Sequence, residues 1–201
     1  THGLSFVPDE TLLTAEEIER VARAAADLGF RKVRLTGGEP TLRHDVVDIV
    51  ARLAAVSGIR EVAMTTTGLR LPELGRPLAD AGLQRVNIHV DSLDVKRLPG
   101  IMRWGDAHQL WEGIRAAEDA GLLPIKINTV VARGYNEDDV VPLAELTLTH
   151  PWSVRFIELM PLGTGEEAQV AIERLVTSAE TRARIADALG ALAPEPSDGP
   201  S

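Results

Sequence analysis

Short apolar segments rich in Val, Ile and Leu alternate along this chain with longer amphipathic segments. Short runs that are apolar nearly throughout are typical of buried parallel strands, and the longer segments have the hydrophobic spacing of helices. The pattern predicts five strands, at residues 31–36, 61–66, 85–90, 124–131 and 153–159. It predicts six helices, at residues 14–28, 45–56, 72–81, 107–120, 138–147 and 178–189. Strands that alternate with helices in this way indicate an α/β fold.

The ends of several helices are marked in the sequence. Thr14-Ala-Glu-Glu17 has the form of a capping box, and Gly29, Gly82 and Gly121 follow predicted helices at the position of a stop. Neither a Rossmann Gly-x-Gly-x-x-Gly signature nor a P-loop is present. A doubly wound sheet remains possible, but a (β/α) barrel, or part of one, fits the pattern better.

The chain begins with loop and helix rather than strand, so we expect one barrel strand to be missing at the front. Apolar surface left open there would be an aggregation liability. We expect a barrel core over residues 1–163 and, over residues 164–201, a last helix and the start of another region. The tail after residue 193 is rich in Pro, Ser and Gly and predicts a loop or disorder.

Composition excludes several functional classes. The 201 residues are 44% hydrophobic and 25% charged, which is ordinary for a globular domain, and the net charge of −9 argues against nonspecific binding of nucleic acid or a membrane surface. There is no apolar run of membrane-spanning length and no signal peptide, which favours the cytoplasm. The chain has no cysteine.

The first predicted strand ends at Gly37-Gly38-Glu39-Pro40. Glycine has no Cβ, so a ligand can approach the backbone here, and Glu39 offers an acceptor for a cationic group. Ligands bind at the carboxyl ends of strands in α/β folds. This strand end is therefore the first candidate site.

Cationic side chains also lie on the predicted inner face of this strand. Lys32 and Arg34 alternate with apolar neighbours and therefore share one face. They could be ion-paired with Glu39, Glu158 or Asp91, or they could bind an anionic group such as phosphate.

The next two strand ends are polar as well. Thr65-Thr66-Thr67-Gly68 could bind a polar ligand or form a turn. Asn87, His89 and Asp91 share one face, where His89 is either a hydrogen-bonded core residue or a ligand contact. The spacing of the histidines does not match a zinc site.

The fourth and fifth strands add further charges. Lys126 and Asn128 share a face, and Lys126 could be buried in a pair with Asp91 or Glu158, anchor a substrate, or form a Schiff base as in class I aldolases. The fifth strand carries Arg155 and is followed by Met160, which could be core filler. Together the five strands predict a polar barrel mouth for an anionic ligand with several functional groups.

Five strings occur together in a characteristic order: Lys32–Pro40, Thr65–Gly68, Val90-Asp-Ser-Leu-Asp94, Lys126–Val131 and Arg155–Gly163. In this order and spacing they resemble the GTP 3',8-cyclase family of radical S-adenosylmethionine (SAM) enzymes, which begins molybdenum cofactor biosynthesis. Gly-Gly-Glu-Pro alone is shared by other radical SAM enzymes. The resemblance covers the chain from Gly3 to Gly163.

The resemblance implies a partial (β/α)6 barrel of the radical SAM type, and it implies that residues 164–201 are a C-terminal helix and the start of the region for substrate and the second cluster. It also implies conversion of GTP to (8S)-3′,8-cyclo-7,8-dihydroguanosine 5′-triphosphate with SAM and two [4Fe-4S] clusters. It places the cofactor-binding residues at Gly37, Gly38, Glu39, His89 and Met160. It places GTP contacts at Arg34, Thr65 and Lys126, with Lys32 and Arg155 as further contacts.

The chain departs from the family pattern in two places and in its cysteines. Thr67 stands where the family commonly has Asn, and His89 stands where it commonly has Ser. The cluster cysteines of the family would lie before Thr1 and after Ser201, so we expect the 201 residues alone to be inactive. The alternatives are a cysteine-free, non-catalytic paralogue that binds SAM or a nucleotide, and another radical SAM enzyme. The family also suggests a homodimer and a downstream partner, cyclic pyranopterin monophosphate synthase.

Overall fold

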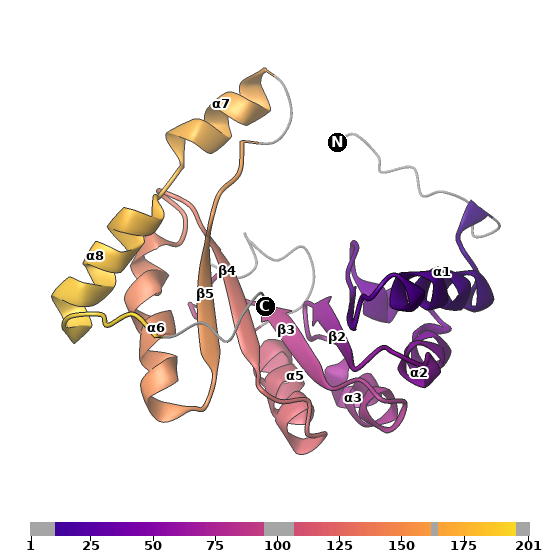
Figure 1. Cartoon of the computed structure of the whole chain (residues 1–201). Coiled ribbons are helices and arrows are strands. Elements are labelled where there is room, and N and C mark those ends of the chain that lie inside the picture. Colours follow the sequence, from indigo (N-terminus) through magenta and orange to yellow (C-terminus); the bar gives the residue numbers. More distant parts are fainter. Residues whose placement is uncertain (1–10, 95–106, 162–164, 196–201) are drawn as a thin grey trace. The chain divides into compact units, whose positions relative to one another are not determined.

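The computed structural model describes residues 11–94, 107–161 and 165–195. Strands and helices alternate through these residues, and the strands are hydrogen-bonded in the order β1-β2-β3-β4-β5 (Figure 1). The strands are β1 (Lys32–Leu35), β2 (Glu61–Thr66), β3 (Arg85–His89), β4 (Lys126–Val131) and β5 (Ser153–Glu158). All five are at the positions that the sequence predicts.

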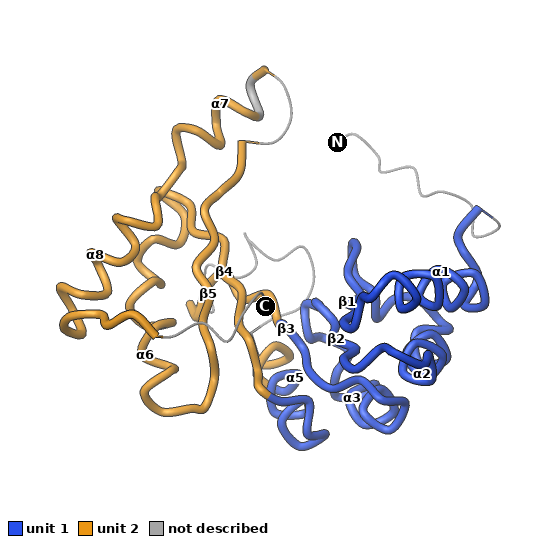
Figure 2. The backbone as a smooth tube through the Cα atoms, viewed as in Figure 1, with its two compact units in different colours: residues 1–87, 112–123 blue, residues 88–111, 124–201 orange. Residues whose placement is uncertain are grey.

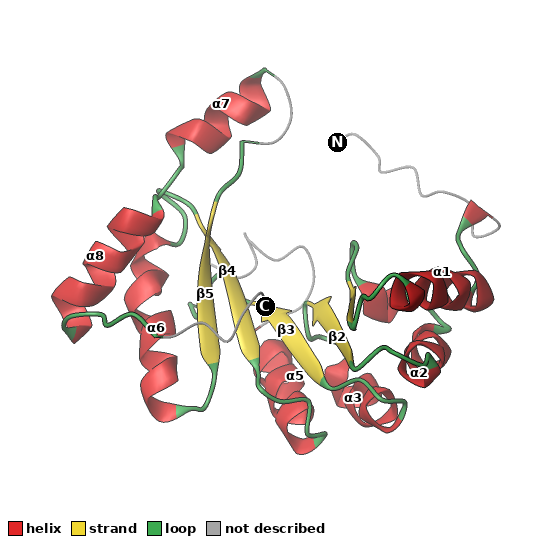
Figure 3. Ribbon diagram, viewed as in Figure 1, coloured by secondary structure: helices red, strands yellow, loops and turns green. Residues whose placement is uncertain are grey.

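Helices connect the strands, as the ribbon coloured by secondary structure shows (Figure 3). The α-helices are α1 (Ala15–Asp27), α2 (Val46–Ala55), α3 (Leu71–Asp80), α5 (Ala107–Asp119), α6 (Val140–Thr149), α7 (Glu166–Glu173) and α8 (Ser178–Leu189). Short 3-10 helices η2 (Pro40–Leu42) and η3 (Glu137–Asp139) precede α2 and α6. The six predicted helices are confirmed, and α7 was not predicted. None of the described helices is long and apolar enough to cross a membrane.

The chain forms two compact units, drawn in different colours in Figure 2. Unit 1 is residues 1–87 and 112–123, and unit 2 is residues 88–111 and 124–201. The division falls within β3. The sequence predicts a different boundary, between residues 163 and 164, and that boundary stays a prediction.

Unit 1 packs α1, α2 and α3 around β1 and β2. In the capping box at the start of α1, the Thr14 hydroxyl accepts from the Glu17 N–H and the Glu17 carboxylate accepts from the Thr14 N–H. β1 and β2 are parallel, with Lys32 opposite Glu61 and Leu35 opposite Met64. The fully buried side chains of this core include Leu53, Met64, Leu71 and Leu78.

A groove of about 390 Å³ lies between α1 and β1 in unit 1. Val21 and Phe30, each 62% exposed, and Leu13 line it with apolar surface. Among the described residues, β1 has a paired strand on its β2 side only. The sequence predicts that apolar surface left open beside the first strand is an aggregation liability, and this groove is such a surface.

Unit 2 packs α6 and α8 against the parallel strands β4 and β5. The register pairs Lys126 with Ser153 and Val131 with Glu158. Its described core contains Val131, Val140, Ala144, Val176 and Ile185, with Phe156 packed against them. A second capping box, formed by Thr177 and Glu180, opens α8.

Candidate functional site

The turn after β1 leaves its backbone open. Gly37 has φ of 150°, which side-chain-bearing residues rarely adopt, and a Cβ built at Gly37 or Gly38 would meet no atom within 4 Å. The two glycines therefore present peptide groups that a ligand can approach, as the sequence predicts.

Glu39 follows these glycines and connects the ends of β1 and β2. Its Oε1 accepts from the Thr41 N–H (3.0 Å), the Thr41 hydroxyl (2.6 Å) and the Thr66 hydroxyl (2.7 Å). Its Oε2 accepts from the Thr67 N–H (2.7 Å) and the Thr67 hydroxyl (2.8 Å). We call this arrangement of Glu39, Thr41, Thr66 and Thr67 the carboxylate clamp.

The carboxylate clamp keeps Glu39 ionised. Burial alone would raise the pKa of Glu39, but the donors from Thr41, Thr66 and Thr67 together hold it below the usual value. Both oxygens of the Glu39 carboxylate already accept hydrogen bonds from the protein, so the main role of this carboxylate in the structure is to position the ends of β1 and β2. A contact from Glu39 to a ligand's amino group stays a prediction.

Within the string Thr65-Thr66-Thr67, two residues are part of the carboxylate clamp. Thr66 is buried. Its hydroxyl donates to Glu39 and accepts from the Gly68 N–H at 3.1 Å. Thr67 donates its hydroxyl and its N–H to Glu39. Thr65 makes no hydrogen bond to the described residues through its side chain, so it is the member of the string that stays available to a ligand.

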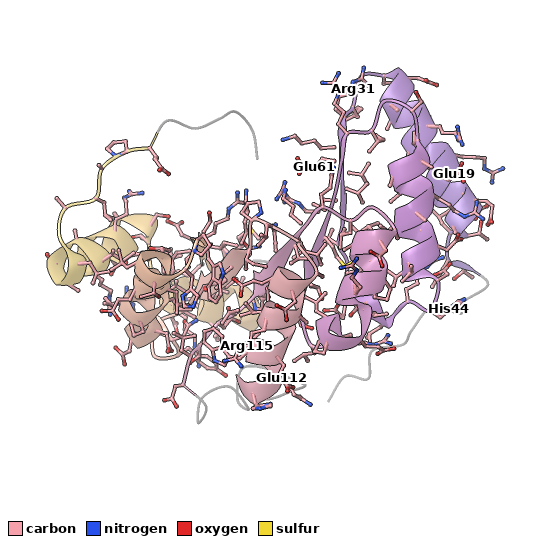
Figure 4. The ribbon with its side chains drawn as sticks, turned by 90° about the horizontal axis from the view of Figure 1, so that it is seen from below. Glu19, Arg31, His44, Glu61, Glu112 and Arg115 are labelled. Carbon is pink, nitrogen blue, oxygen red and sulfur yellow. The ribbon has the colours of Figure 1, made fainter. Side chains whose placement is uncertain are left out.

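One face of the unit 1 strands carries a chain of ion pairs near the amino ends of the strands. Lys32 Nζ lies 3.5 Å from Glu61 Oε2, and the buried Arg85 donates from Nε to Glu61 Oε1 at 2.7 Å. Arg85 Nη1 also reaches Asn87 Oδ1 at 3.5 Å. Figure 4 shows Glu61 on the side of the unit 1 strands away from the helix that carries Glu19. Lys32 pairs with Glu61, so the predicted pairing of Lys32 with Glu39, Glu158 or Asp91 is wrong.

Arg34 and Thr65 lie further along the same face, toward the carboxyl ends. Arg34 pairs in register with Ala63, two residues before Thr65, so both side chains have the parity of Lys32 and Glu61. Arg34 is exposed and has no ion pair within the described part of the chain. An exposed guanidinium at a strand end beside an open glycine turn suits an anionic ligand.

His89 ends β3 in unit 2 and is held by an acid. Its Nε2 lies 2.7 Å from Asp91 Oδ2, and this hydrogen bond raises the pKa of His89 above its usual value despite partial burial. Asp91 Oδ1 accepts from the Val130 N–H at 3.0 Å, and the buried Asn136 donates from Nδ2 to the Asp91 carbonyl at 2.7 Å. His89 is thus a fixed, half-exposed residue rather than a packed core histidine.

The sheet of unit 2 adds two cations and an amide on one face. Lys126 and Asn128 have the same parity on β4, and Asn128 pairs in register with Arg155 on β5. The Oδ1 atom of Asn128 is buried without a hydrogen-bond partner among the described residues, as is Asn87 Nδ2 in unit 1. A buried polar atom without a partner is costly, and a bound ligand would relieve the cost at Asn128.

The last predicted residues of the site lie at and beyond the end of β5. Glu158 Oε1 accepts from the Ser178 N–H at the start of α8, which fixes that helix. Met160 is 61% exposed and therefore is not core filler.

The predicted site residues fall into two groups. Unit 1 holds Lys32, Arg34, Gly37, Gly38, Glu39 and Thr65, and unit 2 holds His89, Lys126, Arg155 and Met160. Glu61, Arg85 and Asn136 were not predicted. The alternation of polar and apolar residues gave a signal for Arg85, and nothing local marked the other two.

The residues present suit one implied cofactor and not the other. In unit 1 the open peptides of Gly37 and Gly38 suit a ligand with polar groups, as SAM has. In unit 2, separately, the unpartnered acceptor of Asn128 suits a ligand with an amino or hydroxyl donor. Iron–sulfur clusters need thiolates, and the chain has no cysteine. Within the described residues no group of three or more His, Cys, Asp or Glu could hold a metal ion.

Comparison with known proteins gives matches over most of the chain. Residues 3–147 match the model of the radical SAM superfamily. A GTP 3',8-cyclase of Pelotomaculum thermopropionicum is 46% identical over 192 residues, which cover 96% of this chain and 58% of that protein. A GTP 3',8-cyclase of Pseudomonas putida strain W619 is 43% identical over 199 residues, which cover 98% and 59%. The chain thus spans somewhat more than half the length of these relatives.

Solved structures show the same fold at lower sequence identity. Coproporphyrinogen III oxidase of Escherichia coli, a radical SAM enzyme, superposes with a TM-score of 0.57 at 14% identity, covering 85% of this chain and 42% of that one. A radical SAM methyltransferase from Sphaerobacter thermophilus gives a TM-score of 0.56 at 21% identity, covering 80% and 54%. The α/β fold with parallel strands of the radical SAM type is thereby confirmed.

Proposed function

Because this chain belongs to the radical SAM superfamily, we propose that it is the barrel portion of a GTP 3',8-cyclase. The observation that carries the proposal is the 46% identity to such a cyclase over 96% of the chain. The polar strand ends support it, because they offer cations for a triphosphate and open peptides for a cofactor.

In this proposal one set of residues binds SAM and another set binds GTP. Gly37, Gly38, His89 and Met160 contact SAM, and the carboxylate clamp holds the glycine turn in the conformation that admits it. SAM held there would supply radical chemistry only on receiving an electron from an iron–sulfur cluster, whose thiolate ligands these residues do not contain. The chain's own part is to orient the reacting groups and exclude water.

Arg34, Thr65, Lys126 and Arg155 contact GTP. The guanidinium groups and the ammonium bind the phosphates by charge-assisted hydrogen bonds, and the Thr65 hydroxyl offers a donor to a neutral part of the nucleotide. Lys32 contributes to the electrostatic potential of this face from its pair with Glu61.

Binding and turnover together test the proposal. SAM and GTP titrated separately by calorimetry into the full-length protein should each bind, and Arg34→Gln should weaken GTP while leaving SAM unchanged. Arg76→Gln is the matched control, because Arg76 is an exposed arginine on α3 paired with Asp80. Failure of GTP to bind, or equal effects of the two substitutions, would refute the assignment.

The absence of cysteine favours one rival, a protein that binds SAM or a nucleotide without catalysis. Anaerobic reconstitution of the full-length protein followed by mass spectrometry of the products separates the two. Cyclised product requires cluster ligands outside these 201 residues, whereas binding without product supports the rival. A homodimer and transfer of the product to a synthase stay predictions, checked by light scattering and by copurification.

A further inference from the structure

His89 differs chemically from the serine that the family commonly has at this position. A serine hydroxyl stays neutral at every physiological pH, whereas an imidazole changes its charge there. The side chain of His89 is 41% exposed and that of Asp91 is 15% exposed, so the ring is accessible while its acidic partner is largely covered.

The surroundings fix the orientation of the ring. Asp91 accepts from the Val130 N–H at one oxygen and meets His89 Nε2 at the other. Asn136, which is 2% exposed, donates from Nδ2 to the Asp91 carbonyl at 2.7 Å and to the Val130 carbonyl at 2.9 Å. A carboxylate that accepts on both sides requires the proton on Nε2, which leaves Nδ1 as the atom that changes protonation.

No described residue bonds to Nδ1 of His89. The Val90 N–H donates to the Asn128 carbonyl at 2.9 Å, which places β3 beside β4 at this point in unit 2. The charged groups on this face are Lys126 on β4, Arg155 on β5 and, on the β2 side of β3, Glu61, which is paired with Arg85.

Two other acids, Asp139 and Asp94, are linked to Ser92, which follows Asp91 in the chain. Asp139, 5% exposed, accepts from the Ser92 hydroxyl at 2.9 Å and from the Leu93 N–H at 3.3 Å. Asp94 follows on the same loop, and its N–H donates to the Ser92 hydroxyl at 3.0 Å. The acid that bonds to His89 is Asp91.

We propose that His89 binds an anionic oxygen of a ligand through Nδ1–H as an imidazolium, so that ligand binding at this strand end weakens as pH rises. The inference rests on the proposed function, because that function supplies the two candidate ligands: the carboxylate of SAM and the phosphates of GTP. Asp91 and Asn136 act as positioning residues. The raised pKa of His89 supports the proposal, since it extends the imidazolium form toward neutral pH.

The test is calorimetric titration of the full-length protein with SAM and, separately, with GTP, from about pH 5.5 to about pH 8.5, across the usual range of histidine. One charge-assisted hydrogen bond corresponds to roughly tenfold in affinity, so we expect about a tenfold loss for one ligand across this range. His89→Ser should abolish that dependence, and Asp91→Asn should move its midpoint to lower pH. His44→Gln, an exposed histidine on unit 1, is the control and should retain the wild-type profile.

Each outcome has a defined meaning. If His89→Ser removes the pH dependence of SAM affinity alone, the partner of Nδ1–H is the SAM carboxylate. If it removes the pH dependence of GTP affinity alone, the partner is a phosphate. Binding of both ligands with the same pH profile in wild type and His89→Ser overturns this inference and leaves the proposed function intact. Absence of binding for both ligands at every pH overturns the proposed function and the inference with it. NMR titration of the His89 ring in the free protein checks Asp91 directly, because Asp91→Asn must lower its midpoint.

Discussion

Replacing Glu39 by glutamine tests whether the carboxylate clamp holds the two strand ends of unit 1. The substitution keeps the size of the side chain and removes its charge. Five hydrogen bonds converge on the carboxylate, from Thr41, Thr66 and Thr67. A glutamine amide has one oxygen, so its nitrogen must face either the two donors of Thr67 or the donors of Thr41 and Thr66.

The expected cost follows from these contacts. If the amide oxygen keeps the Thr41 and Thr66 donors, the Thr67 N–H and hydroxyl lose a charged acceptor. Hydrogen bonds to charged groups contribute about 1.5–3 kcal/mol each, but water reaches this half-buried group and reduces the loss. We expect Glu39→Gln to lower the free energy of unfolding by about 2–4 kcal/mol at neutral pH.

The pH dependence supplies an internal check. The folded-state pKa of Glu39 lies below its ordinary value of 4.5, so its stabilisation is present above pH 4.5 and is lost as pH falls through the lowered pKa. Urea unfolding of wild type and Glu39→Gln should therefore differ at neutral pH and converge in acid. Glu145→Gln, an exposed glutamate on α6, is the control and should match wild type.

Amide exchange at Thr67 gives the local readout of the clamp. The Thr67 N–H donates to Glu39 at 2.7 Å and should exchange faster in Glu39→Gln. A double-mutant cycle with Thr67→Val should show coupling between the two positions. A loss below about 0.5 kcal/mol at neutral pH, within the usual range of surface substitutions, would refute the reasoning.

Three further substitutions probe other parts of the fold. Glu61→Gln should destabilise the protein by about 3 kcal/mol in urea unfolding, because it leaves the buried Arg85 without its acid; a loss no larger than that of an exposed ion pair would contradict this. Gly113→Ala should cost about 1–3 kcal/mol by thermal unfolding, because a Cβ there would lie 2.2 Å from the Gly68 carbonyl oxygen; an unchanged melting temperature would show that α5 shifts freely. Phe30→Ser should reduce concentration-dependent light scattering if the groove beside β1 drives self-association, and unchanged scattering would exclude that role.

The elements were predictable because their signals are local. The capping box at Thr14 and the apolar runs of the strands specify ends and faces within a few residues, and the structure reproduces them. α7 was missed because its N-cap is Gly165, which makes no side-chain hydrogen bond, so no starting signal precedes it.

The site was predictable only where a single strand end defines it. Gly37 and Gly38 form the open turn that their lack of Cβ indicates. The Lys32–Glu61–Arg85 chain depends on the parallel register of neighbouring strands, which no local pattern specifies. Likewise, Asn136 reaches Asp91 across 45 residues of sequence, so its role emerges only from the tertiary structure.

The two departures from the family pattern bear on whether the site has degenerated. Thr67 lacks the amide of the usual Asn, yet both of its donors reach Glu39. His89 is bulkier than the usual Ser, yet Asp91 holds it, and the Val130 N–H holds Asp91 in turn. Both replacements are therefore accommodated by hydrogen bonds of the surrounding residues, and the His89–Asp91 pair is the reason for placing the pH dependence at His89.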